Sequence, residues 1–211
     1  MKRLHELTPE QILNQHRSTP LRVYEYDSDQ QGRIQRSRNL VLWAIKAFPP
    51  MPESRQRRKI IELGAGACDI SGWFSWGHDV HAYESSQAAT EHVAKRWPYV
   101  KQHHGDLHEV PAEDCDILIL CEILEHLPDP LKICREWMPR AGFVIISSPF
   151  NGDLNPASKC AEHVWSFDNA DFQQFFKEGH QRILRSETFK MGGYEDWVGI
   201  SRREADFPKP E

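Results

Sequence analysis

Paired cysteine motifs are absent from the sequence. The five cysteines are an odd number, no Cys-x-x-Cys spacing occurs, and three of them fall within apolar runs typical of a core. A disulfide framework or a zinc ribbon is therefore not expected, and this usage is typical of a reducing compartment. The five are Cys68, Cys115, Cys121, Cys134 and Cys160.

Long apolar runs are missing as well. The longest, from Leu40 to Ala47, is interrupted by Lys46 and is far shorter than a bilayer requires. The opening residues, MKRLHELTPEQ, contain no apolar core of the kind found in secretory signals. We therefore expect a cytoplasmic protein with no membrane span.

An excess of positive charge is the third absence. The chain has 26 basic and 31 acidic residues and a net charge of −5, which excludes a general basic coat for nucleic acid. Basic residues do gather between Arg33 and Lys59, where they suit either an RNA or phosphate-bearing substrate or a solvated helix face. A hydrophobic fraction of 39% is enough for a core, and 211 residues suit one α/β domain with modest additions.

From residue 58 onward, short apolar runs alternate with helical patterns. Apolar strands separated by helices are typical of a parallel sheet that is covered on both faces. The end differs, because Arg182–Met191 and Asp196–Arg202 follow each other across Gly192-Gly193 and predict an antiparallel hairpin. We expect a Rossmann-like, doubly wound α/β fold with a mostly parallel seven-stranded sheet and this C-terminal hairpin. The parallel strands are expected at Lys59–Leu63, Val80–Glu84, Val100–His103, Asp116–Leu120 and Phe143–Ser147, with crossover helices such as Gln87–Arg96 and Pro130–Met138.

The N-terminal part predicts two helices that precede this sheet. Thr8 is the expected N-cap of the first helix, with Pro9 at the first helical position and Gln11 completing a capping box. A polar, irregular segment is expected from Tyr26 to Gln35, followed by a second helix that stops before Pro49. We therefore expect a helical cap and linker at residues 1–57, the main domain at 58–205 and a tail at 206–211.

Residues 60–70 form a strand that leads into Gly64-Ala65-Gly66 and then into a predicted helix. Small residues at such a turn let the backbone approach a nucleotide closely, and Glu84 closes the next strand, where a carboxylate can bind ribose hydroxyls. NAD is disfavoured because Asp69 replaces the third glycine of its motif and because Glu62 would repel a pyrophosphate. A cationic cofactor without phosphates fits this loop better.

Four segments in this order, E-L-G-A-G-A-C, A-Y-E-S, H-G-D-L and C-D-I-L-I-L-C-E-I-L-E-H-L, resemble the class I S-adenosylmethionine-dependent methyltransferases. The resemblance covers residues 58–203 and implies that S-adenosyl-L-methionine is the cofactor. One departure is Cys68, because the family commonly has a third glycine there. The implied cofactor-binding residues are Glu62, Gly64 and Gly66 for the methionine part, Glu84 for the ribose, Asp106 with Leu107 for the adenine, and Cys121 with Glu122 beside the cofactor.

A second cluster, Glu122, Glu125 and His126, directly follows the fourth parallel strand. In a helical turn these positions share one face, and His163 follows the fifth strand, so all four side chains are expected at the ligand crevice. The four could hold Mg²⁺ or another divalent metal that lowers the pKa of a substrate hydroxyl. Alternatively, His126 or His163 acts as a general base without metal, with Glu125 beside it. In a third interpretation the cluster is structural, with His126 bonded to a backbone carbonyl.

The same cluster resembles the ubiquinone-pathway O-methyltransferases and, more weakly, the small-RNA 3′-terminal 2′-O-methyltransferases. We therefore expect O-methylation of a hydroxylated small molecule or glycan, with metal-dependent RNA 2′-O-methylation as an alternative. A non-catalytic cofactor- or partner-binding module on the same fold is a further alternative. The sequence predicts no oligomeric state.

The seven tryptophans are unusual for a chain of this length. Trp73 and Trp76, on the helix predicted after the glycine loop, are expected to pack in the core or against a helix, with lining of the site entrance as an alternative. Trp43 and Trp165 lie on the two segments predicted to face the substrate, so we expect these two rings to contact it.

Overall fold

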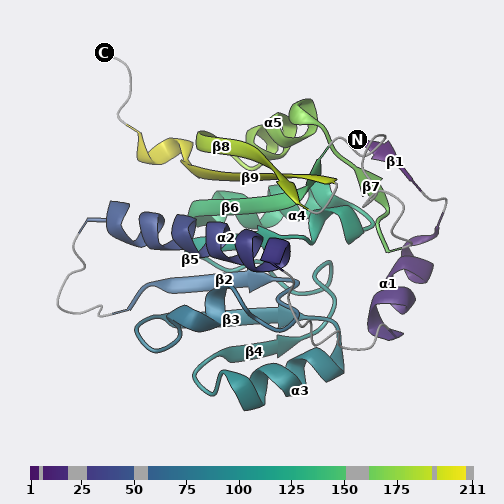
Figure 1. Cartoon of the computed structure of the whole chain (residues 1–211), viewed down its shortest axis with the longest axis horizontal. Coiled ribbons are helices and arrows are strands. Elements are labelled where there is room, and N and C mark those ends of the chain that lie inside the picture. Colours follow the sequence, from purple (N-terminus) through teal and green to yellow (C-terminus); the bar gives the residue numbers. More distant parts are fainter. Residues whose placement is uncertain (5–6, 19–27, 50–56, 151–161, 192–193, 208–211) are drawn as a thin grey trace.

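The computed structural model describes residues 1–4, 7–18, 28–49, 57–150, 162–191 and 194–207. Its centre is a seven-stranded sheet with the order β4-β3-β2-β5-β6-β9-β8 (Figure 1). The first five of these strands are parallel, and β9 runs antiparallel to β6. The edge strand β8 is antiparallel to β9 and therefore points in the same direction as the first five. This confirms the predicted fold class. The strands span Lys59–Leu63 (β2), Asp79–Glu84 (β3), Lys101–His104 (β4), Cys115–Cys121 (β5), Ala141–Phe150 (β6), Gln181–Met191 (β8) and Tyr194–Arg203 (β9).

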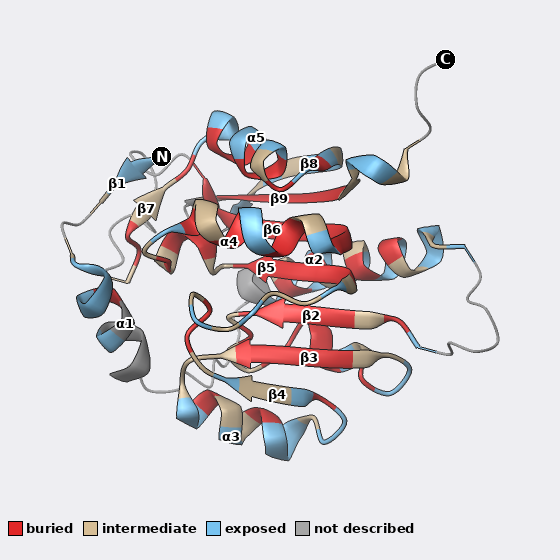
Figure 2. Cartoon of the chain, turned by 180° about the vertical axis from the view of Figure 1, so that it is seen from behind, coloured by how far each residue is buried: buried red, intermediate tan, exposed pale blue. Residues whose placement is uncertain are grey.

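Helices cover both faces of the sheet, with α2 on the side shown in Figure 1 and α4 on the side shown in Figure 2. The α4 helix begins as predicted, because the side chain of Asp129 accepts a hydrogen bond from the Lys132 amide and Pro130 occupies the first turn. The α-helices are Pro9–Ser18 (α1), Ser28–Ala47 (α2), Gln87–Arg96 (α3), Pro130–Trp137 (α4) and Asn169–Glu178 (α5), and the 3₁₀ helices are Ser71–Phe74 (η1), Leu124–His126 (η2), Met138–Arg140 (η3) and Glu204–Asp206 (η5).

The central strands explain why the core has two layers. Side chains alternate along a strand, so Ile117 and Ile119 on β5 pack beneath α2, while Leu118 and Leu120 pack on the opposite side with α4. All four are fully buried. Each contributes about 1.5–3 kcal/mol by burial, which is why the sequence shows an unbroken apolar run here.

The N-terminal segment lies beyond the carboxyl ends of the parallel strands, at the right of Figure 1 and the left of Figure 2. The predicted capping box is present at the start of α1, since Thr8 and Gln11 exchange hydrogen bonds of 2.8 and 3.2 Å. The sequence did not predict β1 (Lys2–Arg3), which pairs antiparallel with β7 (Trp165–Ser166). The division into a cap, a main domain and a tail remains a prediction.

Two predictions about helices are wrong. The segment expected to be irregular is helical from Ser28. Ile34, Val41 and Ala44 are buried at helical spacing, and this packing stabilises a helix that also includes the polar residues of its first turns. The helix expected after the glycine loop is only the short η1. The chain returns to β3 at Asp79, and this leaves too few residues for a full crossover helix.

The tryptophans are placed differently from the prediction. Trp73 and Trp76 are 58% and 68% exposed, because η1 is too short to bury them. Trp43 packs edge-on against Phe143 near the amino end of β6, at the opposite end of the strand from the predicted site. Trp165 lies in β7 and donates a hydrogen bond to the Leu127 carbonyl at 2.7 Å.

Within the described residues, four cysteines are free thiols. The fifth, Cys160, and the predicted hairpin turn at Gly192-Gly193 lie outside the described residues. In the part of the chain that the structure describes, no helix has both the length and the apolar character needed to cross a membrane.

Candidate active site

The glycine loop after β2 adopts a backbone that explains its composition. Gly64 and Gly66 have φ angles of +65° and +50°, in the left-handed region that favours glycine. A Cβ atom at Gly64 would collide with the side chain of Ile123, which packs over the loop. Cys68 also has a positive φ of +56°. The departure from glycine at this position is therefore accommodated in a conformation that glycine would adopt with less strain.

Glu62 holds this loop in place from inside the protein. One of its carboxylate oxygens accepts hydrogen bonds from the amide and the hydroxyl of Ser71, at 3.1 and 2.5 Å, and from Cys68 Sγ at 3.6 Å. Burial raises the pKa of Glu62, and these hydrogen bonds oppose that rise. Glu62 thus tethers the loop to η1, while its contact with a cofactor's methionine part remains a prediction.

Glu84, at the end of β3, joins two loops. Its carboxylate accepts hydrogen bonds from the Gly66 amide at 2.9 Å and from the Ser86 amide at 2.8 Å. Asp106 and Leu107 are buried after β4, and Asp106 accepts a hydrogen bond from the His108 amide at 2.9 Å. These residues lie at the carboxyl ends of neighbouring parallel strands, which is where doubly wound folds bind their ligands.

At the end of β5, Cys121 is buried, and its Sγ lies 3.6 Å from Ser37 Oγ on α2. Burial raises the pKa of Cys121 to about 12, so its thiol is neutral at physiological pH. The next residue, Glu122, has a φ of +54°, which is strained for a side chain of this size. The strained residue turns the chain sharply from β5 into η2.

Three of the four residues of the predicted cluster come together. One ligand atom each from Glu125, His126 and His163 lies within 4.8 Å of the others. Glu125 is buried; one of its oxygens accepts a hydrogen bond from Ser148 Oγ at 2.8 Å. The other oxygen, Oε1, has no hydrogen-bond partner among the described residues and lies 3.8 Å from His126 Nε2.

The protonation of His126 follows from its neighbour. Its Nδ1 lies 2.9 Å from the backbone carbonyl of Glu162, and a carbonyl can only accept. Nδ1 therefore carries the hydrogen, and Nε2 is the ring nitrogen that faces Glu125 Oε1, 3.8 Å away. The ring of His163 stands nearly perpendicular to that of His126, with 4.7 Å between centroids.

Glu122, the fourth predicted member, is engaged elsewhere. Its Oε1 accepts a hydrogen bond from Ser147 Oγ at 2.9 Å, and its Oε2 forms an ion pair of 2.7 Å with Arg33 on α2. The predicted set of four thus divides into a group of three and one carboxylate tied to α2.

The N-terminal strand fixes the segment that carries His163. The Val164 amide donates to the Glu125 carbonyl at 2.8 Å, and the Leu4 amide donates to the Val164 carbonyl at 2.7 Å. Val164, which directly follows His163, is therefore hydrogen-bonded to η2 and to the residue after β1. A strand of two residues has no sequence signature, so sequence reasoning missed this support.

Comparisons with known proteins agree with this geometry. The family described as "Methyltransferase domain" matches residues 61–139, which run from β2 to the end of α4 and include the glycine loop, Glu84, Asp106 and Cys121. This match agrees with the resemblance to class I S-adenosylmethionine-dependent methyltransferases seen in the sequence motifs. None of the curated proteins compared matches the sequence.

Solved structures with the same fold include several methyltransferases. One is the N-methyltransferase NodS from Bradyrhizobium japonicum WM9 in complex with S-adenosyl-L-homocysteine, which is 12% identical in sequence, with a TM-score of 0.69. The alignment covers 90% of this chain and 96% of NodS. The magnesium protoporphyrin IX methyltransferase from Synechocystis PCC 6803 is 14% identical with a TM-score of 0.67, covering 85% and 89%. A third is a complex of the Haloferax volcanii Trm112 activator with a putative methyltransferase, at 10% identity, a TM-score of 0.62 and coverage of 82% and 92%.

The structure also contains a buried acidic residue that the sequence analysis missed. Asp196, on β9, is fully buried, and neither of its carboxylate oxygens has a hydrogen-bond partner among the described residues. Burial, and next the charge of Glu122, raise the pKa of Asp196 to about 8, while Arg33 opposes the rise. Burial likewise raises the pKa of Glu125, as do the charges of Glu122 and Asp196. An acidic residue directly before the apolar run from Trp197 to Ile200 was the available signal.

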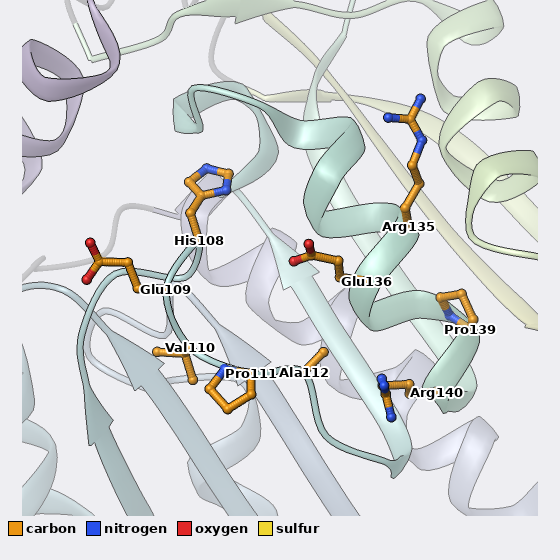
Figure 3. A pocket seen from close by; sticks show the side chains of 9 residues that line it. All are labelled: His108, Glu109, Val110, Pro111, Ala112, Arg135, Glu136, Pro139 and Arg140. Carbon is orange, nitrogen blue, oxygen red and sulfur yellow. The ribbon is translucent and has the colours of Figure 1, made fainter.

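A surface pocket of about 540 Å³ lies apart from these residues, between the loop after β4 and the end of α4 (Figure 3). His108 to Ala112 line one side and Arg135 to Arg140 contribute to the other. Arg135 and Arg140 form ion pairs with Glu178 and Asp114. None of the predicted cofactor-binding or catalytic residues lines this pocket.

Proposed function

We propose that this protein is a class I methyltransferase that transfers the methyl group of S-adenosyl-L-methionine to a hydroxyl oxygen of a small molecule or glycan. The supporting observation is that Glu125 and His126, directly after β5, and His163, just before β7, each bring a ligand atom within 4.8 Å of the others. An oriented imidazole beside a buried carboxyl group suits a hydroxyl group that must lose its proton.

The reaction requires no other reactant. The acceptor oxygen forms a bond to the methyl carbon while the carbon–sulfur bond breaks, and the sulfonium keeps the electron pair and becomes a neutral thioether. The hydroxyl proton passes to a base, for which His126 Nε2 is the candidate. The Glu162 carbonyl holds Nδ1–H and stabilises the imidazolium that forms. A positioned base contributes roughly 10²–10⁴-fold, and alignment of the two reactants supplies much of the rest.

A divalent metal fits the same three residues. Glu125 Oε1 is buried without a hydrogen-bond partner among the described residues, and the backbone carbonyl bonded to His126 Nδ1 orients Nε2 as a ligand. Two imidazoles and a carboxylate suit a transition-metal ion better than Mg²⁺. When bound, such an ion lowers the pKa of a hydroxyl that it holds. Glu122 would keep its ion pair with Arg33 and would not be a metal ligand.

The RNA alternative draws little support from the basic segment. Arg36 forms an ion pair with Glu187 at 3.0 Å, Arg38 donates to the Asp69 carbonyl, and Arg58 lies 3.6 Å from Asp116. Charges already engaged within the protein are less available to bind phosphates. The proposal therefore keeps a small molecule or glycan as the acceptor, and RNA becomes an outcome of the test.

The test is a methyl-transfer assay with isotope-labelled S-adenosyl-L-methionine over hydroxylated small molecules, glycans and RNA, each with and without a chelator. We expect an O-methylated product, with activity lost in His126→Ala and retained in the control His92→Ala on α3. Loss of activity in chelator and in His163→Ala supports the metal. An N-methylated product, or an RNA product alone, contradicts the proposal.

A further inference from the structure

Three aromatic side chains gather on one exposed part of the protein. Trp73, Trp76 and Tyr99 are 58%, 68% and 55% exposed, which makes them the most exposed large hydrophobic residues of the described chain. The rings of Trp76 and Tyr99 lie 4.6 Å apart. Trp73 and Trp76 lie in η1 and in the turn that follows it, at a spacing that places side chains on the same side of a 3₁₀ turn. Exposed apolar side chains gathered in this way mark an interaction site, and we call these three rings the aromatic surface.

The aromatic surface is held in place by the fold. Trp97, at the end of α3, packs with its ring centroid 6.2 Å from that of Trp73, and its indole nitrogen donates a hydrogen bond to the Ala67 carbonyl at 3.2 Å. A Cβ atom at Gly72 would collide with the ring of Trp97, so η1 lies directly against this ring. The guanidinium of Arg38 on α2 lies over Trp73, 4.5 Å from the ring centroid. The exposure of the aromatic surface is therefore a property of the packed structure.

The aromatic surface lies away from the candidate active site. Trp76 and Tyr99 shortly precede β3 and β4, so they lie near the amino ends of these strands, whereas Glu84 lies at the carboxyl end of β3. In Figure 1 the arrows of β3 and β4 point towards the N-terminal segment, so these two rings belong to the other edge of the sheet. A partner bound there would leave the cofactor crevice open.

Positive charge borders the aromatic surface. Arg38 and Arg96 each lie over an indole ring, and Lys95 is exposed beside Arg96 in the last turn of α3. Among the described residues, the carboxylate that forms an ion pair with these cations is that of Asp69, 2.9 Å from Arg96. Cations therefore outnumber carboxylates here, although the whole chain has a net charge of −5. This excess of positive charge favours a partner with negative charge.

The arrangement of the rings distinguishes between anionic partners. Single-stranded nucleic acid binds to separate rings on which successive bases stack. Here Trp76 packs on Tyr99 at an interplanar angle of 58°, and Trp73 packs on Trp97 at 54°, so the rings are tilted and already in contact with one another. Indole and phenol rings combine an apolar body with one polar group, and they are enriched where lipid headgroups meet the hydrocarbon of a bilayer. A lipid surface can therefore accept these rings together.

We propose that the aromatic surface binds a membrane that contains anionic lipids. Trp73, Trp76 and Tyr99 enter the headgroup region, and Lys95 and Arg96 lie against the lipid phosphates. The carboxyl ends of the parallel strands then face away from the membrane. This contact is separate from the proposed methyl transfer and does not depend on it.

The test measures binding of the full chain to vesicles of phosphatidylcholine and to vesicles of an equal mixture of phosphatidylcholine and phosphatidylglycerol. We expect the mixed vesicles to bind about tenfold or more tightly than the neutral ones, and this binding to weaken as salt rises. Phospholipids with brominated acyl chains quench tryptophans that enter a bilayer. In mixed vesicles they should quench the fluorescence of the wild-type protein.

The double variant Trp73→Ala/Trp76→Ala removes two of the rings. It should bind the mixed vesicles about tenfold or more weakly and lose most of the quenching, because binding scales with the apolar area that enters the lipid. Both side chains are mostly exposed, so its unfolding temperature should stay close to that of the wild type. Leu184→Ala removes an exposed side chain on β8 and is the control, with unchanged binding expected. Tyr99→Ala is a second variant, in case the double variant does not fold.

Four outcomes overturn the inference. Equal binding of neutral and mixed vesicles by the wild-type protein excludes recognition of anionic lipid, and so does quenching that survives in the double variant. Binding of polyuridylic acid in place of vesicles, lost in the double variant, would assign the aromatic surface to RNA. Self-association in sedimentation that is lost in the double variant, without vesicle binding, would assign it to a second copy of the chain.

Discussion

The imidazole of His126 donates a hydrogen bond through Nδ1 to the backbone carbonyl of Glu162, 2.9 Å away. This contact fixes which nitrogen carries the hydrogen and directs the lone pair of Nε2 towards Glu125 Oε1. It also links η2 to the segment that carries His163, so the geometry of the cluster depends on two loops that meet.

His126→Ala should lower kcat by about 10²–10⁴-fold, because the acceptor hydroxyl loses its base or its metal ligand. The affinity for S-adenosyl-L-homocysteine should change little, since His126 is not among the predicted cofactor contacts. Steady-state kinetics with calorimetry of cofactor binding separates the two effects. An equal loss of cofactor affinity would show that the cluster belongs to the cofactor site instead.

Glu84→Gln should weaken cofactor binding by roughly 10–100-fold, because a neutral amide replaces a carboxylate that is predicted to accept from both ribose hydroxyls. The variant also weakens the contact with the Gly66 amide, which holds the glycine loop. Isothermal titration with S-adenosyl-L-homocysteine measures the change, and Glu91→Gln on the exposed face of α3 is the matched control. Unchanged affinity in Glu84→Gln would remove this residue from the cofactor site.

Cys68 offers a test of backbone strain. Because its φ is +56°, Cys68→Gly should be more stable than Cys68→Ala by about 1 kcal/mol, the reverse of the usual order. Urea unfolding of both variants measures the difference. Cys134, inside α4, is the control, since there Ala should be the more stable replacement by about 1 kcal/mol. The usual order at Cys68 would show that this residue is not left-handed in solution.

The raised pKa of Asp196 predicts how stability depends on pH. The folded protein keeps this carboxyl protonated up to about pH 8, whereas the ordinary pKa is 3.8, so folding takes up a proton between these values. The stabilisation is complete below pH 4 and is lost as the pH rises through 8, by up to about 1.4 kcal/mol per pH unit. Asp196→Asn should lack this contribution, so its advantage over the wild type should grow from pH 5 to pH 8 in thermal unfolding. A constant difference would show that Asp196 is solvated or paired.

Much of the fold could be predicted because its signals are local. The bounds of β2 and α3 agree with the prediction residue for residue, since an apolar run and a helical pattern each ended at clear boundaries. The start of α2 could not be predicted, because its first turns are polar and acquire a buried side only against the sheet. The short length of η1 could not be predicted either, because it depends on where β3 begins.

The candidate site divides in the same way. Glu125 and His126 could be found because they follow a strand end at short spacing, and His163 because the fifth strand ends nearby. The ion pair between Arg33 and Glu122 joins residues far apart in sequence, and no local pattern predicts it. Asp196 was overlooked for the same reason, since its burial is set by the hairpin that brings β9 alongside β6.

The central claim is that the methyl group goes to oxygen at the cluster of Glu125, His126 and His163. The most direct measurement is the ¹³C spectrum of the product formed from S-adenosyl-L-methionine with a ¹³C-labelled methyl group and the acceptor found in the assay. The account predicts a methoxy carbon that is absent from the reaction of His126→Ala. A methyl carbon bonded to nitrogen, or a methoxy signal of equal intensity in the variant, would contradict it.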